Sequence, residues 1–361
     1  MLINERYQDL DHRRSPLTAP NELPVPAGPA LSPDVLRLAS DAAGLIDKAR
    51  ARNTRRGYLA DWVDFRVWCA KHDATPVPAD PRVVALYLTD LAQGGAGRRP
   101  RKVSTIRRRV AALVHYHRAE GHELDVHDRV LRDTWAGIRR TYGRAPSAKR
   151  AAVTEFLRLL VASCPTDTLL GLRDRALLLV GFAGCFRRAE LVALDVADCA
   201  FNQEGVFLML NRSKTDQEGS GSEKAVPFGA HQETCPVRAL TTWLEAAGIT
   251  SGPVFRRVTR HGTVLPKRLL SESVALVVKR AVSAAQAEAI EQGNRWLADT
   301  LDPARYAGHS LRAGFITSAA AAGVSESDIM RQSGHRRADT LRKYIRHATA
   351  FRHNAAAKVG L

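Results

Sequence analysis

The chain has 361 residues, with 54 lysines and arginines against 37 aspartates and glutamates, so its formal net charge is +17. This length is sufficient for two domains with separate hydrophobic cores. The excess of positive charge is typical of proteins that bind nucleic acid, because basic side chains release counterions from phosphates; a merely basic protein of another class is the alternative.

Segments that would direct the chain to a membrane or to secretion are not found in the sequence. The apolar run ALLLVGFAG is too short to span a bilayer and ends close to arginines. The start, MLINERYQDLDHRRS, lacks the apolar core of a signal peptide. The five cysteines are scattered without a CxxC pair, as is usual for reduced, buried thiols. We therefore expect no membrane partner and a location in the bacterial cytosol or nucleoid. The gene would be bacterial or carried by a mobile element.

The first part of the chain predicts an arm followed by a helical domain. Residues 1–33 contain six prolines and few large apolar side chains, which indicates a disordered or loosely docked arm. Residues 34–140 have apolar residues at helical spacing and no strand-like alternation. Helices are expected at about 34–50, 53–72, 80–93, 103–120 and 127–140.

An aromatic stripe marks the second of these helices. Tyr58, Trp62, Phe65 and Trp68 recur at the spacing of one helix face. Such a stripe is far more often part of a core than a platform for stacking bases, so we assign it to the core of the first domain.

The basic segment 141–152 predicts a linker, and residues 153–361 predict a second domain with a C-terminal tail. The runs GVFLMLN (205–211) and KAVPF (224–228) are the only convincing strands, joined by a polar turn. The predicted fold class is therefore mainly α, with one small antiparallel sheet. Helices are expected at about 154–163, 171–184, 236–247, 271–292, 310–322, 326–333 and 338–347.

Basic side chains gather around the start of the fourth helix. Seven lie within twelve residues that contain no acid. A helix start also offers free N–H groups to phosphate, so this region is a candidate DNA-binding surface, although a solvated basic face is the alternative. The candidate DNA-binding residues, including three at the start of the second helix, are Arg52, Arg55, Arg56, Arg98, Arg99, Arg101, Lys102, Arg107 and Arg108.

A second set of polar residues lies in the C-terminal domain. Phosphoryl transfer needs fixed positive charge and hydrogen-bond donors around the non-bridging oxygens, and arginine provides both. Tyrosine is a poor nucleophile at its free pKa near 10, so cationic neighbours and a base would have to activate it. Each residue alone has an ordinary structural explanation, but the set points to phosphate chemistry. Its members are Arg187, Glu190, Lys214, His309, Arg312, His335 and Tyr344.

These residues and their spacing resemble the tyrosine recombinases, also called the phage integrase family. GCFRRAELVAL (184–194) is similar to the family's first conserved box, and SKT (213–215) to its lysine-bearing β-turn. Residues 308–347 cover the second box, and several stretches resemble the simple bidomain, Cre-like branch. Ser333 departs from the leucine that often precedes Gly-His. The resemblance extends over about residues 34–361 and implies a helical, SAM-like core-binding domain followed by the catalytic domain.

The resemblance also implies a mechanism. Tyr344 would attack the scissile phosphate and form a 3′-phosphotyrosyl link. Arg187, Arg312 and His335 would hold the non-bridging oxygens. His309 would take the tyrosine proton.

The remaining roles are less directly defined. Lys214 would protonate the leaving 5′-oxygen, with the nearby Lys224 as an alternative, and Glu190 would orient the set without touching DNA. No metal and no cofactor are expected, because arginines supply the charge and the covalent bond conserves the phosphodiester.

The implied partner is double-stranded DNA with inverted half-sites, bound by a homotetramer that is a monomer or dimer when free. A non-catalytic DNA-binding protein of the same fold and a type IB topoisomerase-like enzyme are the alternatives. An unrelated basic RNA-binding protein is a more remote one. The target sequence, the need for accessory proteins and the biological task do not follow from the sequence.

Overall fold

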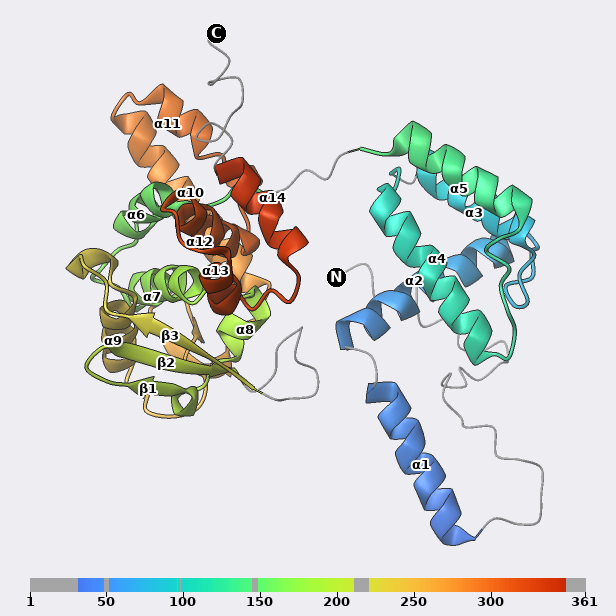
Figure 1. Cartoon of the computed structure of the whole chain (residues 1–361), viewed down its shortest axis with the longest axis horizontal. Helices are drawn as coiled ribbons and strands as arrows, with labels where there is room; N and C mark the ends of the chain where they lie inside the picture. Colours follow the sequence, from blue (N-terminus) through green and yellow to red (C-terminus); the bar gives the residue numbers. More distant parts are fainter. Residues whose placement is uncertain are drawn as a thin grey trace. The chain divides into compact units, whose positions relative to one another are not determined.

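The computed structural model describes residues 32–48, 52–95, 97, 99–144, 149–210 and 221–348. Contacts divide the chain into two units, Met1–Pro146 and Ser147–Leu361 (Figure 1). Most of the predicted N-terminal arm and the predicted C-terminal tail beyond residue 348 lie outside the described residues. The mostly helical fold class predicted from the sequence is confirmed.

The described residues of the first unit form helices and no strands, in agreement with the sequence. Each helix begins and ends within two residues of its predicted bounds. Asp80 accepts the Arg82 N–H at the start of the third helix, and Gly94, with φ of 77°, ends it. The helices are α1 (Pro33–Lys48), α2 (Arg52–Lys71), α3 (Pro81–Gln93), α4 (Val103–Ala119) and α5 (Arg129–Tyr142).

The aromatic stripe of α2 forms the core of the first unit, as predicted. Trp62, Phe65 and Trp68 are 5%, 0% and 7% exposed, and they pack against α3 and α4. Trp62 stacks on Tyr116 of α4, with ring centroids 5.0 Å apart. Burial of these large rings, rather than base stacking, accounts for the spacing of the stripe.

A buried polar network also joins α2, α3 and α4. Arg109 of α4 is 7% exposed and donates to Asp64 of α2 and to the Tyr87 hydroxyl of α3. The Tyr87 hydroxyl donates to Asp64 at 2.8 Å. Arg109 therefore belongs to the interior, although it stands within the basic run of α4.

The second unit has a helical body beside two small antiparallel sheets. Its described elements are α6 (Thr154–Ala162), α7 (Leu169–Ala183), α8 (Arg188–Ala193), β1 (Cys199–Phe201), β2 (Gly205–Leu210), β3 (Ser222–Pro227), α9 (Pro236–Ala246), β4 (Arg256–Val258), β5 (Val264–Arg268), α10 (Ser273–Glu291), α11 (Arg295–Thr300), α12 (His309–Ala321), α13 (Glu326–Ser333) and α14 (Ala338–Ala348).

The sheets are larger than the sequence predicted. The first has the order β1-β2-β3, with Val206 opposite Val226, and the second pairs β4 with β5. The prediction of a single two-stranded sheet was wrong in omitting β1 and the β4–β5 hairpin. β1 has only three residues, and β4 and β5 carry arginines and a proline, so neither gives a recognisable strand pattern.

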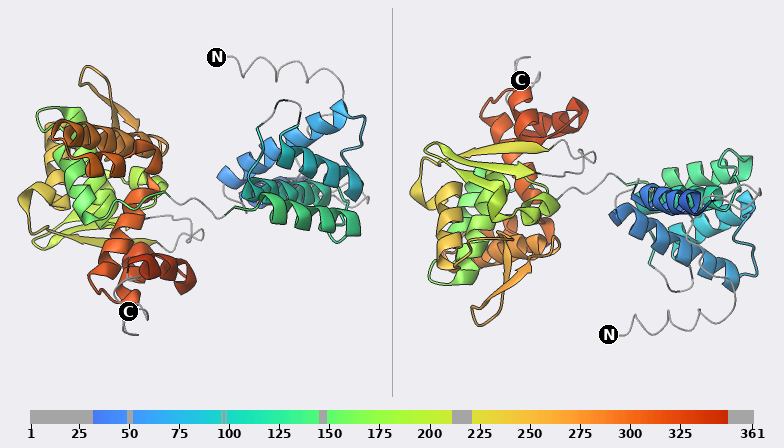
Figure 2. Two further views of the ribbon diagram at one scale, coloured as in Figure 1. Left: turned by 90° about the horizontal axis from the view of Figure 1, so that it is seen from above. Right: turned by 90° about the horizontal axis from the view of Figure 1, so that it is seen from below.

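Helix α7 lies at the centre of the second unit. The run from Ala176 to Gly181 is buried without interruption, so the helix is covered on all sides. α6, α9 and α12 pack against it, and α9 also packs against β3 (Figure 1 and Figure 2). α7 therefore ends at Ala183 in the interior of the second unit. The residues that follow it lead to Arg187.

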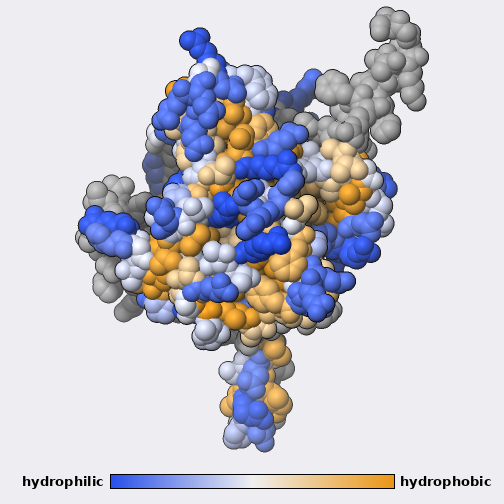
Figure 3. All heavy atoms as spheres, turned by 90° about the vertical axis from the view of Figure 1, so that its left-hand side faces the viewer, coloured by the Kyte–Doolittle hydropathy of each residue, from blue (hydrophilic) through white to orange (hydrophobic). Residues whose placement is uncertain are grey.

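The surface of the second unit is mixed in character. On the face drawn in Figure 3, hydrophobic residues occur in small groups between hydrophilic ones. Strand β2 alternates between buried and exposed residues towards its end, so Phe207 and Met209 remain exposed. Across the described part of the chain, no helix combines the length and apolar character needed to cross a membrane.

Candidate active site

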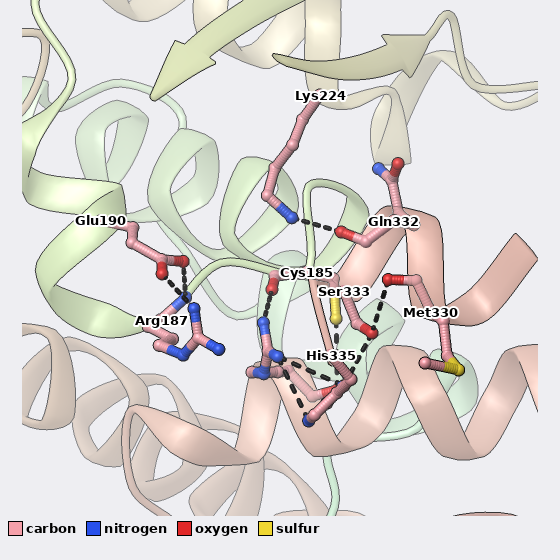
Figure 4. A network of polar contacts seen from close by, with 9 residues as sticks. Cys185, Arg187, Glu190, Lys224, Met330, Gln332, Ser333 and His335 are labelled. Carbon is pink, nitrogen blue, oxygen red and sulfur yellow. Dashed lines mark hydrogen bonds and ion pairs between the residues drawn. The ribbon is translucent and has the colours of Figure 1, made fainter. Parts of the chain in front are cut away.

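The turn between α7 and α8 positions Arg187. Cys185 has a φ of 50°, a left-handed conformation that is rare for residues other than glycine, and it turns the chain at the end of α7. Arg187 then stands directly before α8. Its N–H donates to Glu190 Oε2 at 2.8 Å and its Nη1 donates to Oε1 at 2.5 Å (Figure 4). Glu190 is 4% exposed and thus orients both the main chain and the guanidinium of Arg187.

Arg312 approaches the same turn from α12. Its side chain is buried, and its Nη1 donates to the Cys185 carbonyl at 2.6 Å. Among the described residues, no carboxylate lies within ion-pair distance of Arg312. A buried cation without a paired anion is costly, so this position favours binding of an anion from outside the chain.

Tyr344 and His309 meet at the edge of the site. The Tyr344 hydroxyl lies 2.8 Å from His309 Nε2, and these residues are 35 positions apart in sequence. Tyr344 is half-buried in a small apolar cluster with Ile316, Ile329 and Leu341, which fixes the position of α14 against α12 and α13.

The pKa shifts of this pair keep both groups neutral. Burial, followed by the charges of Arg312 and Arg187, lowers the pKa of His309 below its ordinary value. Burial raises the pKa of Tyr344, although Arg312 opposes the shift. At neutral pH the pair is therefore a neutral imidazole and an intact phenol, and the tautomer with its proton on Nδ1 accepts the phenol O–H at Nε2.

His335 lies on the other side of Arg312. Arg312 Nη2 is 3.4 Å from its Nδ1 and 3.3 Å from its Nε2, and the Ser333 hydroxyl is 2.7 Å from Nδ1 (Figure 4). Burial lowers the pKa of His335 to about 4, with Arg312 and Arg187 adding to the effect. His335 is therefore neutral until an anion enters the site.

The lysine that the structure brings to this site is Lys224. Lys224 is 5% exposed. Its ammonium group donates to the Gln332 carbonyl (Figure 4) and lies 5.3 Å from the centroid of the Phe186 ring. Burial lowers its pKa to about 8. Lys214, the lysine predicted to protonate the leaving group, lies between β2 and β3 and outside the described residues.

Most of the predicted DNA-binding residues that the structure describes are exposed, and Arg108 among them forms an ion pair. Arg108 pairs with Asp61 at 2.7 Å and donates to the Gly57 carbonyl at 3.0 Å, so its charge is partly neutralised. Arg55 is half-buried. Arg98 and the side chain of Arg52 lie outside the described residues. The exposed members of the set are Arg56, Arg99, Arg101, Lys102, Arg107 and Arg108.

Three neighbours of the site were not assigned to it from the sequence. Cys185 supplies the carbonyl that holds Arg312, Ser333 contacts His335, and Lys224 joins β3 to α13. In the sequence, Ser333 is only a departure from the family pattern, and Lys224 is only the alternative to Lys214. Their contacts span the fold, so local sequence carries little signal for them.

This arrangement provides one nucleophile, one base and a cluster of cationic donors. Arg187 and Arg312 both act electrostatically on His309 and His335, and Arg312 also acts on Tyr344. In the described part of the chain, no group of three or more histidines, cysteines, aspartates or glutamates could hold a metal ion. The geometry suits a reaction in which Tyr344 attacks a phosphodiester.

Comparison with a solved structure defines the fold. The chain is similar to the XerH site-specific recombinase bound to palindromic difH substrate in a post-cleavage complex, with a TM-score of 0.59 and 17% identity over 91% of this chain and 85% of that one. The fold is thus that of the tyrosine recombinases, enzymes that cleave and rejoin DNA.

Sequence comparisons define the family. Residues 152–350 match the phage integrase family. The integrase/recombinase xerD homolog of Selenomonas ruminantium is 38% identical over 322 residues, covering 88% of this chain and 89% of that protein. The recombinase cre of Escherichia phage P1 is 24% identical over 310 residues, covering 83% and 85%. The chain belongs to the phage integrase family, as predicted; its assignment to the Cre-like branch stays a prediction.

Proposed function

We propose that this chain is a site-specific DNA recombinase that cleaves and rejoins DNA through a covalent bond to Tyr344. The observation that carries the proposal is the buried Arg312 cation of α12, which lies beside His335. His309, on the same helix, contacts the Tyr344 hydroxyl. A scissile phosphate would supply the anion that this cation lacks.

The chemical step follows from the groups present. The Tyr344 oxygen bonds to phosphorus as the phosphorus–5′-oxygen bond breaks, which leaves a 3′-phosphotyrosyl link. The phenol proton passes to His309, and the leaving 5′-oxygen receives a proton from the acid, for which we keep Lys214. Rejoining is the reverse reaction, so no external source of energy is consumed.

Arg187, Arg312 and His335 would stabilise the charge that develops on the non-bridging oxygens. Donors that are already fixed before the reaction need little reorganisation in the transition state. The Glu190 and Cys185 contacts supply that fixation for the two arginines. Phosphate entry would raise the pKa of His335, because an anion favours the imidazolium form.

Strand exchange requires two cleaved sites to be brought together. We propose a homotetramer on two DNA sites, each with inverted half-sites, that forms from monomers or dimers. A location in the bacterial cytosol and an origin in a mobile element belong to the same proposal. Support comes from the palindromic DNA in the XerH complex and from the net charge of +17.

A nicking-closing enzyme or a non-catalytic binder of the same fold would share parts of this site. The relatives are recombinases, and the nucleophile, base and arginines are all present, so both alternatives are less favoured. A footprint with inverted half-sites would support recombination, whereas relaxation of supercoils without site pairing would support the topoisomerase alternative.

The direct test is covalent trapping on nicked DNA that carries the bound sequence, in the presence of EDTA. The wild type should form a protein–DNA adduct. Tyr344→Phe should bind the same DNA with unchanged affinity and form no adduct, because the nucleophilic oxygen is removed. Tyr142→Phe, the same change at an exposed tyrosine of α5, is the control and should react normally. An adduct of wild-type yield with Tyr344→Phe would remove Tyr344 from the nucleophile role.

A further inference from the structure

Ser333 occupies a position from which its hydroxyl can set the protonation pattern of His335. It is the last residue of α13 and is 1% exposed. Gly334, with φ of 64°, turns the chain directly after it, so that Ser333 and His335 can face each other across two positions. The Ser333 Oγ lies 2.7 Å from His335 Nδ1 and 3.4 Å from the Met330 carbonyl oxygen (Figure 4).

The other polar neighbour of the imidazole does not distinguish the two nitrogens. Arg312 Nη2 is 3.4 Å from Nδ1 and 3.3 Å from Nε2, so it forms no directed bond that would select one of them. In the described part of the site, the contact that favours one nitrogen over the other is the Ser333 hydroxyl at Nδ1. Nε2 is then the nitrogen left for a ligand.

The distances indicate the direction of the serine bond in the free enzyme. A hydroxyl donor prefers about 2.7–2.8 Å to its acceptor oxygen, and a bond at 3.4 Å is weak. The Met330 carbonyl already accepts the Gly334 N–H at 2.8 Å. The Ser333 proton is therefore better placed on Nδ1, which puts the single imidazole proton of neutral His335 on Nε2.

A hydroxyl can also serve the protonated histidine, because it both donates and accepts and can rotate. If His335 gains a proton when phosphate binds, Nδ1–H donates to Ser333 Oγ, and the serine proton turns to the Met330 carbonyl. Nε2–H remains a donor in both states. An apolar residue at position 333 could do neither.

We propose that Ser333 is a positioning residue that keeps His335 Nε2–H available as a hydrogen-bond donor to a scissile phosphate, whether the imidazole is neutral or charged. The use of that donor rests on the proposed function, whereas the tautomer itself does not. The charged and titratable groups that face His335 are Arg312 and His309 of α12, Arg187 before α8 and Lys224 of β3.

The first test needs no DNA. In protein labelled with nitrogen-15 at its 12 histidines, His335 is assigned by its loss in His335→Gln. The wild type at neutral pH should show a protonated Nε2 and an unprotonated Nδ1 that accepts a hydrogen bond. Ser333→Ala should show a mixture of tautomers, and Ser333→Thr should restore the wild-type pattern. A wild type with its proton on Nδ1, or a Ser333→Ala spectrum like that of the wild type, would overturn the proposal.

The second test measures cleavage in single-turnover reactions across pH. Loss of one hydrogen bond to a group that contacts the transition state should slow Ser333→Ala by about tenfold, with DNA affinity unchanged. Ser318→Ala is the matched control. The Ser318 hydroxyl of α12 accepts the Thr154 N–H at 3.0 Å, so this variant also loses one hydrogen bond, but not one to His335. Equal rates for the two alanine variants at every pH would reject a role for Ser333 in the reaction.

The two readouts separate the two proposals. If the wild type shows the expected tautomer but forms no covalent adduct on the bound DNA, the proposed function fails and the tautomer inference stands. If the wild type cleaves DNA and the tautomer is the opposite one, the Ser333 inference fails and the proposed function stands.

Discussion

The reactive side chains of this site owe their orientation to buried partners that do not react. Glu190 holds Arg187 at two points, and the Cys185 carbonyl holds Arg312. Lys224 belongs with these partners, because its ammonium group already donates to the Gln332 carbonyl, three positions before His335. Burial and a lowered pKa do not by themselves make Lys224 the acid, since a buried lysine that only joins β3 to α13 would show both properties.

Lys214 and Lys224 can be distinguished by replacing the 5′-bridging oxygen of the scissile phosphate with sulfur. A thiol, with a pKa of about 8.5, leaves without the proton that an alkoxide needs. Lys214→Ala should slow cleavage of ordinary DNA by about 10²–10⁴-fold, and its cleavage rate should be restored on the sulfur-substituted DNA. Lys224→Met should be slow on both substrates, because it loses the tie between β3 and α13. Restoration of the Lys224 variant alone would assign the acid to Lys224.

At the scale of elements, α12 is the organising helix of the site. It carries His309 and Arg312, and it packs against α7, α13 and α14. Its close contact with the start of the second unit depends on Gly314. Ala152 donates to the Ser310 carbonyl at 2.9 Å, and a Cβ added at Gly314 would lie 2.0 Å from the Ala152 carbonyl oxygen.

Gly314→Ala should therefore destabilise the second unit, because main chain must shift to admit the methyl group. The expected decrease in the free energy of unfolding is about 1–3 kcal/mol, measured by urea denaturation. Cleavage should also slow, since α12 carries two of the site residues. Gly137→Ala in α5 is the control; a Cβ there meets nothing within 4 Å, so stability should stay equal or rise by up to about 1 kcal/mol. Equal stability of wild type and Gly314→Ala would contradict the close approach.

His117 should make the first unit sensitive to acid. It is fully buried in α4, with Nδ1 donating to the Leu113 carbonyl at 2.8 Å and Nε2 accepting the Ala79 N–H at 3.0 Å. The imidazole can therefore gain a proton only at Nε2, which would break the bond from Ala79. Burial lowers the pKa of His117 below its ordinary value. Below pH 6.5 the unfolded state binds the proton first, so the folded state loses stability as pH falls.

The expected change is up to about 1.4 kcal/mol per pH unit from pH 6.5 down to the folded pKa. Urea denaturation of the whole chain at several pH values measures it. His117→Gln should flatten this slope in the first unit's transition, and His127→Gln, at an exposed histidine of the same unit, should not. A slope unaffected by His117→Gln would place the acid sensitivity elsewhere.

At the scale of the whole molecule, the chain has a net charge of +17. Only some of the basic side chains behind this charge are on the surface and unpaired. Some of the basic residues form ion pairs with acids of the same unit, as the buried Arg109 and the exposed Arg108 do in α4. The number of basic side chains available to DNA is therefore smaller than the 54 in the sequence. Exposed residues of the loop before α4, such as Arg101 and Lys102, retain theirs.

Salt dependence of DNA binding measures this available charge. Each phosphate contact contributes about −0.9 to the slope of log affinity against log salt concentration, so replacing both Arg101 and Lys102 with glutamine should make the slope less steep by about 1.8. The control replaces Arg129 and Arg132, which lie 3.8 Å and 3.2 Å from Asp133, and should change the slope less. Equal changes in the two double variants would reject a specific contact by the basic run.

Much of the fold followed from sequence because helices are local. Apolar spacing of 3.6 residues, proline at helix starts and glycine at helix ends depend on neighbours within a few positions, and these predicted the long helices to within two or three residues. The β4–β5 hairpin and β1 were missed because short, charged strands form only where a partner strand and a core are supplied by the rest of the chain.

The sequence by itself determined the class of fold, the family and the order of the reactive residues, because those depend on residue type, spacing and likeness to known sequences. The tertiary structure alone decided which neighbours orient them. It placed Lys224 beside Gln332, Cys185 beside Arg312 and Tyr344 beside His309, across separations of 108, 127 and 35 residues. Burial and the electrostatic field that shifts each pKa arise only when such distant segments come together, so they cannot be read from any one stretch of the chain.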